Sequence, residues 1–208
     1  MNVLFIGAHF DDLELGCGGT IRKFSQKGYN VYSYIATTSG YSNHDGTKIR
    51  DSHIARSEGE KATNILGSHL ICGQYSTKAL MCTTELIEEI NSIIDKHNIN
   101  MIFTHWDGDI QQDHRNLSLA TLTAARHVPR LLMYRCNWYI SSDTFDANFY
   151  IDISKEIDYK IKALKEYTSE SKRRGEEWIQ FFVDQNKSNG KIIGVQYAES
   201  FKLAKYLL

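Results

Sequence analysis

The chain has 208 residues and a mass of 23.9 kDa, a length that suits one domain with a substantial buried core. Hydrophobic residues make up 42% of the sequence and charged residues 24%, which excludes the collagen, coiled-coil and disordered classes. The 24 basic residues balance 25 acidic ones, so the net charge of −1 creates no field that would attract nucleic acid or an anionic membrane. We therefore expect a small-molecule substrate, with no nucleic acid and no membrane as partner.

The N-terminal apolar segment, residues 1–8, is too short for a signal peptide or a membrane span and leads directly into His9 and two aspartates. We predict that it forms the first strand. The four cysteines, at positions 17, 72, 82 and 136, form no Cys-x-x-Cys pair, and a chain of this length needs no disulfide bonds to hold its core. These features predict a reduced, cytoplasmic protein.

Apolar segments alternate with segments of helical periodicity along the first 126 residues. Strands are predicted at residues 3–8, 31–37, 69–72 and 100–104, and helices at residues 18–27, 48–66, 84–97 and 117–126. This alternation is typical of βαβ units. We therefore predict an α/β, Rossmann-like fold with a mostly parallel sheet flanked by helices, in which the first four strands have the order 3-2-1-4.

Aromatic and apolar patterns continue beyond residue 129. Residues 131–140 and 149–153 are predicted as further strands, and two apolar stripes predict C-terminal helices: Ile157, Ile161 and Leu164, and Trp178, Phe181 and Phe182. No internal repeat or composition break interrupts the chain, so residues 1–208 are predicted to form a single domain. The polar loop 38–46 follows the second strand and is a candidate substrate loop.

A first polar cluster follows the first strand, where ligands bind in open α/β sheets. His9 and Asp12 have residue types and a spacing that can chelate one divalent metal, which leaves Asp11 free as a proton acceptor. The glycines at positions 16, 18 and 19 do not fit the G-x-G-x-x-G fingerprint of dinucleotide-binding proteins. This mismatch disfavours a nicotinamide-dependent oxidoreductase.

A second polar cluster, residues 105–115, follows the fourth strand. The first and fourth strands are neighbours in the predicted sheet, so both clusters face one crevice. His114 then completes a His-Asp-His set with His9 and Asp12 and leaves a coordination position open for water. Zinc suits this set best, although Fe²⁺ also binds two histidines and one carboxylate. The alternative is that Asp113 and His114 only cap the following helix.

Both clusters lie within longer motifs that resemble those of a known family. Residues 8–12 read Ala-His-Phe-Asp-Asp and residues 15–20 read Leu-Gly-Cys-Gly-Gly-Thr. This resembles the A-H-P-D-D…G-C-G-G motif of the PIG-L/LmbE-like superfamily of zinc-dependent N-acetylsugar deacetylases. Residues 105–114 resemble the second motif of that family, and weaker matches lie at Glu58, Ala62, Leu66 and Gly67 and in residues 162–169 and 198–201. The resemblance thus covers nearly the whole chain.

The resemblance implies a Rossmann-like fold in which His9, Asp12 and His114 bind zinc and Asp11 is the general base. It also implies that an acyl group, usually acetyl, is removed from the amino nitrogen of a glucosamine-type sugar or sugar conjugate. In the expected reaction a metal-activated water attacks the amide while Asp11 takes the water proton. Members of the family often form trimers or hexamers, so a homo-oligomer is a further implication.

The sequence departs from the family pattern at two positions. Phe10 replaces the usual proline after the first histidine, which we expect to alter the loop without touching the chemistry. Gln111 replaces a histidine of the second motif that is thought to steady the oxyanion or act as an acid. A glutamine amide donates a hydrogen bond but gives up no proton at pH 7, so we expect Gln111 to keep only the stabilising role.

Three further residues have two possible roles each. Asp113 either orients a ligand imidazole or caps a helix. Arg50 and Arg56 lie near the start of the second predicted helix, where they can hold a substrate phosphate or carboxylate, although an arginine on an exposed helix is usually solvated. The alternative to an enzyme is a non-catalytic sugar-binding or regulatory protein of the same fold.

Overall fold

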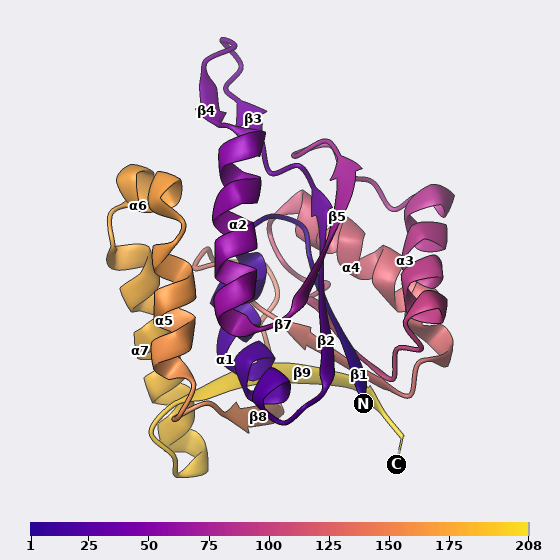
Figure 1. Ribbon diagram of the computed structural model, residues 1–208, viewed down its shortest axis with the longest axis vertical. Helices are drawn as coiled ribbons and strands as arrows, with labels where there is room; N and C mark the ends of the chain where they lie inside the picture. Colours follow the sequence, from indigo (N-terminus) through magenta and orange to yellow (C-terminus); the bar gives the residue numbers. More distant parts are fainter. Residues whose placement is uncertain (208) are drawn as a thin grey trace.

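The computed structural model describes residues 1–207 and contains a seven-stranded sheet, which lies between groups of helices (Figure 1). The strand order is β5-β2-β1-β6-β7-β9-β8, and the first five of these strands are parallel. The strands are β1 (Asn2–Gly7), β2 (Asn30–Thr37), β5 (His69–Tyr75), β6 (Met101–His105), β7 (Arg130–Tyr134), β8 (Phe149–Asp152) and β9 (Ala198–Tyr206). The α/β class, the mostly parallel sheet and the 3-2-1-4 order of the first four predicted strands are confirmed.

Strand β1 is apolar on both of its faces because helices cover both sides of the sheet. Val3 and Phe5 belong to one hydrophobic cluster, and Leu4 and Ile6 belong to another. This division follows from the period-2 alternation of side chains along a strand. The ring of Phe5 stacks on Phe103 of β6 at a centroid distance of 4.6 Å, which fixes these two neighbouring strands in register.

Two groups of helices enclose the sheet (Figure 1). One face carries α1 (Asp12–Gln26), α2 (Ser52–Leu66), α5 (Ile157–Lys165) and α7 (Glu177–Ile193), and the other carries α3 (Thr84–Lys96) and α4 (Gln112–Ala124). The short elements are the 3₁₀ turn η1 (Ala125–His127), helix α6 (Thr168–Arg174) and a hairpin of β3 (Tyr41–Ser42) and β4 (Lys48–Arg50). Among the described residues, no helix is both long enough and apolar enough to cross a bilayer.

Helix α1 begins at Asp12, six residues before the predicted start at residue 18. The prediction was wrong at this end, because the glycines at positions 16, 18 and 19 all pack against neighbouring elements. They lie inside the helix and permit close packing, since a Cβ atom at Gly16 would lie 2.3 Å from the ring of Tyr134 and one at Gly19 would lie 2.7 Å from Ile153. The Gly-Cys-Gly-Gly segment is therefore a packing surface that brings α1 close to the ends of β7 and β8.

Other predicted boundaries also shift. Residues 48–50 form a strand and not the start of a helix, because Asp51 caps α2 by accepting hydrogen bonds from the backbone N–H groups of His53 and Ile54. The predicted strand 131–140 ends at Tyr134, after which the chain is irregular. Strand β9 lies outside every predicted strand. It closes the sheet between β7 and β8 in antiparallel orientation.

Candidate active site

The chain turns sharply between β1 and α1, and the turn presents two aspartates to the same cavity. Asp11 has a φ of 110°, a conformation that non-glycine residues adopt at a cost. The backbone N–H of His9 donates to Asp12 Oδ2 at 2.7 Å, and that of Phe10 donates to Ser39 Oγ at 2.8 Å. Phe10 is buried against Gly59 of α2, so the residue at the family's proline position does not line the cavity.

Three side chains from the two predicted clusters meet above the ends of β1 and β6. His9 Nδ1 lies 3.4 Å from Asp12 Oδ2 and 3.3 Å from His114 Nε2, and His114 Nε2 lies 3.3 Å from Asp12 Oδ1. Two ligands bound at 2.0–2.1 Å to one tetrahedral ion lie about 3.3–3.4 Å apart. The spacing of these three residues therefore fits a single metal ion, which the donor set of two imidazoles and a carboxylate also suits.

A second carboxylate binds the far nitrogen of each of these histidines. His9 Nε2 lies 2.9 Å from Asp113 Oδ2, and His114 Nδ1 lies 3.1 Å from Asp109 Oδ2. Such pairs place the ring proton on the far nitrogen and direct the lone pair of the other nitrogen toward the ion. Asp113 also accepts from the backbone N–H groups of Lys78 and Leu80, so it orients His9 and does not face the cavity.

Electrostatics at these histidines favour a bound cation. Burial alone lowers the pKa of an imidazole, but the carboxylates of Asp12 and Asp109 reverse this effect and raise the pKa of His114 to about 10. Burial disfavours the charged form of Asp12 as well, yet the surrounding histidines hold its pKa well below the usual range. Buried carboxylates around two imidazoles thus leave negative charge for a cation to compensate.

A second group of possible ligands overlaps the first. Asp12, His105, His114 and Cys136 are all buried, and one ligand atom of each lies within 4.8 Å of the others. His105 Nε2, however, accepts a hydrogen bond from the Ala8 N–H at 2.9 Å. His105 also does not line the cavity. Burial and the neighbouring His114 lower the pKa of His105 to about 4, so its ring is neutral at pH 7. Neither His105 nor Cys136 is among the sequence-predicted ligands.

Asp11 lines the same cavity as the three candidate ligands, beside Asp12 in the chain. Its charged partner is Arg50, whose Nη1 lies 3.5 Å from Asp11 Oδ2. Burial raises the pKa of Asp11 to about 6, Arg50 favours its charged form, and Asp12 disfavours it. A carboxyl group with such a pKa can take up and return a proton near neutral pH.

Gln111 is the N-cap residue of α4. Its Oε1 accepts the backbone N–H of His114 at 2.9 Å, and its side chain lines the same cavity as His9 and Asp11. Because the carbonyl end of the amide is held by the helix, Nε2 is the end available to donate to a ligand. This arrangement is compatible with the predicted stabilising role.

The two arginines singled out in the sequence have different surroundings. Arg50 lines the cavity and is buried, whereas Arg56 is half exposed on α2 and pairs with Glu60 at 3.0 Å. A residue at this position of the helix faces solvent because the buried side of α2 is formed by residues such as Ala55, Glu58 and Ala62. Arg56 does not line this cavity, and we do not include it in the proposed site.

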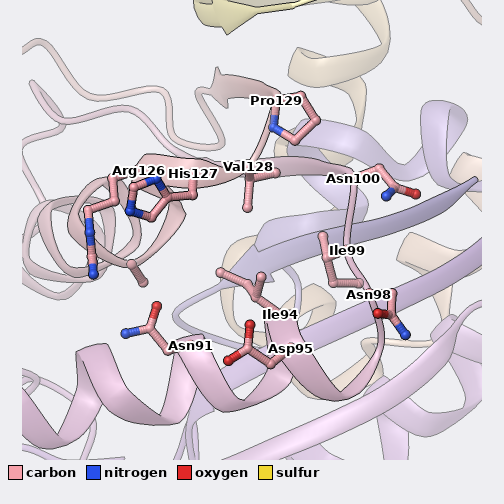
Figure 2. Close-up of a pocket in the computed structure, with 11 residues that line it drawn as sticks. Asn91, Ile94, Asp95, Asn98, Ile99, Asn100, Arg126, His127, Val128 and Pro129 are labelled. Atoms are coloured by element: carbon pink, nitrogen blue, oxygen red, sulfur yellow. The ribbon is translucent and has the colours of Figure 1, made fainter.

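The cavity has a volume of about 290 Å³ and contains the candidate ligands, Asp11 and Gln111. Ser39 and Tyr41, from the predicted substrate loop, also line it. A larger cavity of about 780 Å³ lies at the amino ends of the strands, where Asn91 and Asp95 of α3 face residues 126–129 (Figure 2). Because ligands in such sheets bind at the carboxyl ends of the strands, we place the active site in the smaller cavity.

Several groups of this site were not identified from the sequence. Asp109 lies within the second cluster but was assigned no role, although its position five residues before His114 is a signal that could have suggested one. Glu170 and Arg174 come from α6, far along the chain, and no local pattern connects them with the first cluster. They reach the cavity through the packing of α6 against α2 and α7.

Residues 4–125 match the model of the PIG-L family, described as GlcNAc-PI de-N-acetylase. The uncharacterized deacetylase YaiS of Escherichia coli (strain K12) is 32% identical to this chain over 177 residues, which cover 80% of this chain and 90% of that protein. The diacetylchitobiose deacetylase of Thermococcus kodakarensis is 25% identical over 220 residues, covering 96% of this chain and 82% of that enzyme.

The fold has close counterparts among solved structures. The conserved protein TT1542 from Thermus thermophilus superposes with a TM-score of 0.83 at 22% identity, covering 99% of this chain and 95% of that one. At this level of identity the likeness concerns the fold. It shows that the overall architecture of the sheet and its helices is shared with another protein of similar length.

Proposed function

Because this chain belongs to the PIG-L (GlcNAc-PI de-N-acetylase) family, we propose that it is a metal-dependent N-deacetylase. Its substrate would be an N-acetylated amino sugar or a conjugate of one, and the bond cleaved would be the amide between the acyl group and the amino nitrogen. The proposal extends to this chain the activity named for its relative in Thermococcus kodakarensis.

The spacing of three side chains supports a metal centre. His9, Asp12 and His114 offer three ligand atoms 3.3–3.4 Å apart, and a carboxylate orients each histidine from behind. We propose these three residues as the metal ligands, with zinc as the ion and Fe²⁺ as the alternative. When bound there, a divalent metal lowers the pKa of a water molecule and polarises an amide carbonyl.

Four other residues would transfer the proton, stabilise the developing negative charge and orient the ligands. Asp11 accepts the proton of the attacking water and then returns it to the leaving amino nitrogen. Gln111 donates a hydrogen bond from Nε2 to the carbonyl oxygen as negative charge develops on it. Asp113 and Asp109 hold His9 and His114 in orientation and touch no substrate, so Asp113 is proposed as a positioning residue and not as an acid or base.

A non-catalytic sugar-binding protein is the competing interpretation. Such a protein has no need of a buried proton acceptor next to a metal site, yet this chain keeps Asp11 in a strained backbone conformation beside the proposed ligands. Strain of this kind costs about 1–3 kcal/mol and is a feature of functional sites. The geometry therefore supports an enzyme.

The direct test is to supply the purified, metal-loaded chain with a panel of N-acetylated amino sugars and to measure both free amine and free acetate. Equal molar amounts of the two products, absent from His114→Ala under the same conditions, are the expected result. Hydrolysis that is undiminished in His114→Ala would exclude the proposed centre as its source.

Gln111→His restores the residue common in the family and should leave kcat/KM within about tenfold of the original, a barrier change of about 1.4 kcal/mol. Gln111→Glu retains an oxygen to cap α4 but loses the donating amide, so we expect kcat to fall about 10²–10³-fold. Steady-state kinetics on one substrate, with thermal unfolding of both variants as a control for the cap, provide the comparison. A Gln111→Glu variant of full activity would remove Gln111 from the mechanism.

A further inference from the structure

One wall of the active-site cavity is made of arginines from two separate segments. Arg50 comes from β4, and Arg173 and Arg174 come from α6. All three guanidinium groups converge on the carboxylate of Glu170: Arg50 Nε lies 3.4 Å from Oε1, Arg174 Nε lies 2.9 Å from Oε2, and Arg173 also pairs with Oε2. The carboxylate of Glu170 is thus shared as an ion-pair partner by three arginines.

Arg50 is the most deeply buried member of this wall. Its side chain is 5% exposed, and its Nε and Nη2 atoms make no hydrogen bond within the described residues. Buried donors in native proteins nearly always have partners, and a buried guanidinium without enough acceptors is costly. Since Arg50 lines the cavity, a ligand with hydrogen-bond acceptors that enters the cavity can accept the hydrogen bonds of Nε and Nη2.

The charges of the side chains that line the cavity also favour an anionic ligand. Its lining includes Lys78 as a fourth cation, whose Nζ lies over the ring of Tyr41 at 4.1 Å. Apart from the proposed metal ligand Asp12, the acidic residues that line the cavity are Asp11 and Glu170. Four cationic side chains against two carboxylates leave a positive surplus next to the proposed metal, and guanidinium groups match carboxylate and phosphate in geometry.

We propose that Arg50, Arg173 and Arg174 form a subsite for a carboxylate or phosphate on the substrate. The inference rests on the proposed function and narrows it: the acylated amino sugar carries an anionic substituent. Arg50 Nη1 lies only 3.5 Å from the proposed base Asp11, so the anion binds close to the scissile amide. A substituent on a ring carbon next to the one bearing the nitrogen satisfies this requirement, whereas one across the ring does not.

Three acetylated sugars that differ in charge at these positions form the test. Methyl N-acetylglucosaminide is neutral, N-acetylglucosamine 1-phosphate has a phosphate beside the acetamido group, and N-acetylmuramic acid has a carboxylate on the substituent at the other neighbouring carbon. We expect kcat/KM to be about tenfold or more higher for at least one anionic sugar than for the neutral one. Comparison of kcat/KM for the phosphate-bearing and the carboxylate-bearing sugar shows which anion the subsite binds.

Variants of α6 link the preference to the arginines. Arg174→Gln, and Arg173→Gln as a second and more exposed variant, should reduce the ratio of kcat/KM for the anionic and neutral sugars to within about threefold. Lys172→Gln is the matched control, because this exposed residue of the same helix carries the same charge and does not line the cavity. Its ratio should equal that of the original chain.

The outcomes separate this inference from the proposed function. Hydrolysis of neutral and anionic sugars at equal kcat/KM overturns the anionic subsite and leaves the deacetylase intact. If no sugar is hydrolysed, calorimetric binding of the same three compounds decides. Tighter binding of an anionic sugar that Arg174→Gln weakens supports the subsite even though the activity fails, and absence of binding by both anionic sugars overturns it.

Discussion

Replacing Asp11 with asparagine should lower kcat about 10²–10⁴-fold while the chain keeps its metal. Asparagine has the shape of aspartate but accepts no proton, so the loss is that of a general base. Asp11 is not among the proposed ligands and takes part in none of the three ligand contacts. Steady-state kinetics and elemental analysis on the same preparation measure both quantities.

The control for this substitution concerns Arg50. Because Asp11→Asn removes one of its two acidic neighbours, loss of activity must be distinguished from a rearranged cavity. A melting temperature within a few degrees of the original, together with an unchanged metal content, shows that the site is intact. An Asp11→Asn variant with more than about a tenth of the original kcat would rule out Asp11 as the base.

Replacing Glu199 with glutamine should produce the largest loss of stability. Lys160 and Glu199 are fully buried, with Lys160 Nζ 2.7 Å from Glu199 Oε1 and 2.7 Å from the carbonyl oxygen of Leu15. Glu199 also accepts the backbone N–H groups of Gly19 and Thr20. The pair thus joins α5 and β9 to the middle of α1, the helix that begins at Asp12.

Breaking a buried ion pair from one side costs about 3–5 kcal/mol, because it leaves an uncompensated charge. In a chain of this length each kcal/mol lowers Tm by about 2–4 °C, so we expect Glu199→Gln to lower Tm by roughly 6–20 °C. The double variant Lys160→Met/Glu199→Gln removes both charges of this pair, so neither is left uncompensated, and it should recover part of the loss. Thermal unfolding of the two variants provides the measurement.

An exposed ion pair serves as the control for this comparison. Arg56 and Glu60 lie 3.0 Å apart on the surface of α2, and each is about half exposed. Such pairs contribute about 0.3–0.5 kcal/mol, so Glu60→Gln should change Tm by less than about 2 °C. A change equally small in Glu199→Gln would contradict the structural role of the buried pair.

The central parallel strands were predictable because strands that are buried on both faces have a continuously apolar sequence. Residues 3–6 and 101–103 are continuously apolar, as expected of strands covered on both faces, and turn residues separate them from amphipathic helices. From the order of these strands it followed that His9, Asp12 and His114 lie near one another. The structure places their ligand atoms at metal-chelating distances.

The remaining parts of the fold depend on contacts that no local pattern contains. The early start of α1 depends on packing against its glycines by Tyr134 and Ile153, which come from distant segments of the chain. Strand β9 pairs with β7 and β8 across more than 45 residues of chain, and its composition of mixed polar and apolar residues gives no strong strand signal. Its position follows from the sheet edges it covers.

The same limitation applies to the site. Arg50 and Arg56 were equivalent in the sequence, and only the hairpin of β3 and β4 decides that Arg50 turns toward Asp11 while Arg56 faces solvent. Cys136 and His105 reach the neighbourhood of Asp12 through the packing of β6 and β7. Their presence creates a second set of possible ligands that the sequence motifs did not suggest.

Metal content decides which residues form the metal centre. Elemental mass spectrometry on the original chain, on His9→Ala and on Cys136→Ser distinguishes the two overlapping ligand sets. We predict about one metal ion per chain in the original and in Cys136→Ser, and none in His9→Ala. Metal retained by His9→Ala and lost from Cys136→Ser would place the ion among Asp12, His105, His114 and Cys136 and contradict the proposed centre.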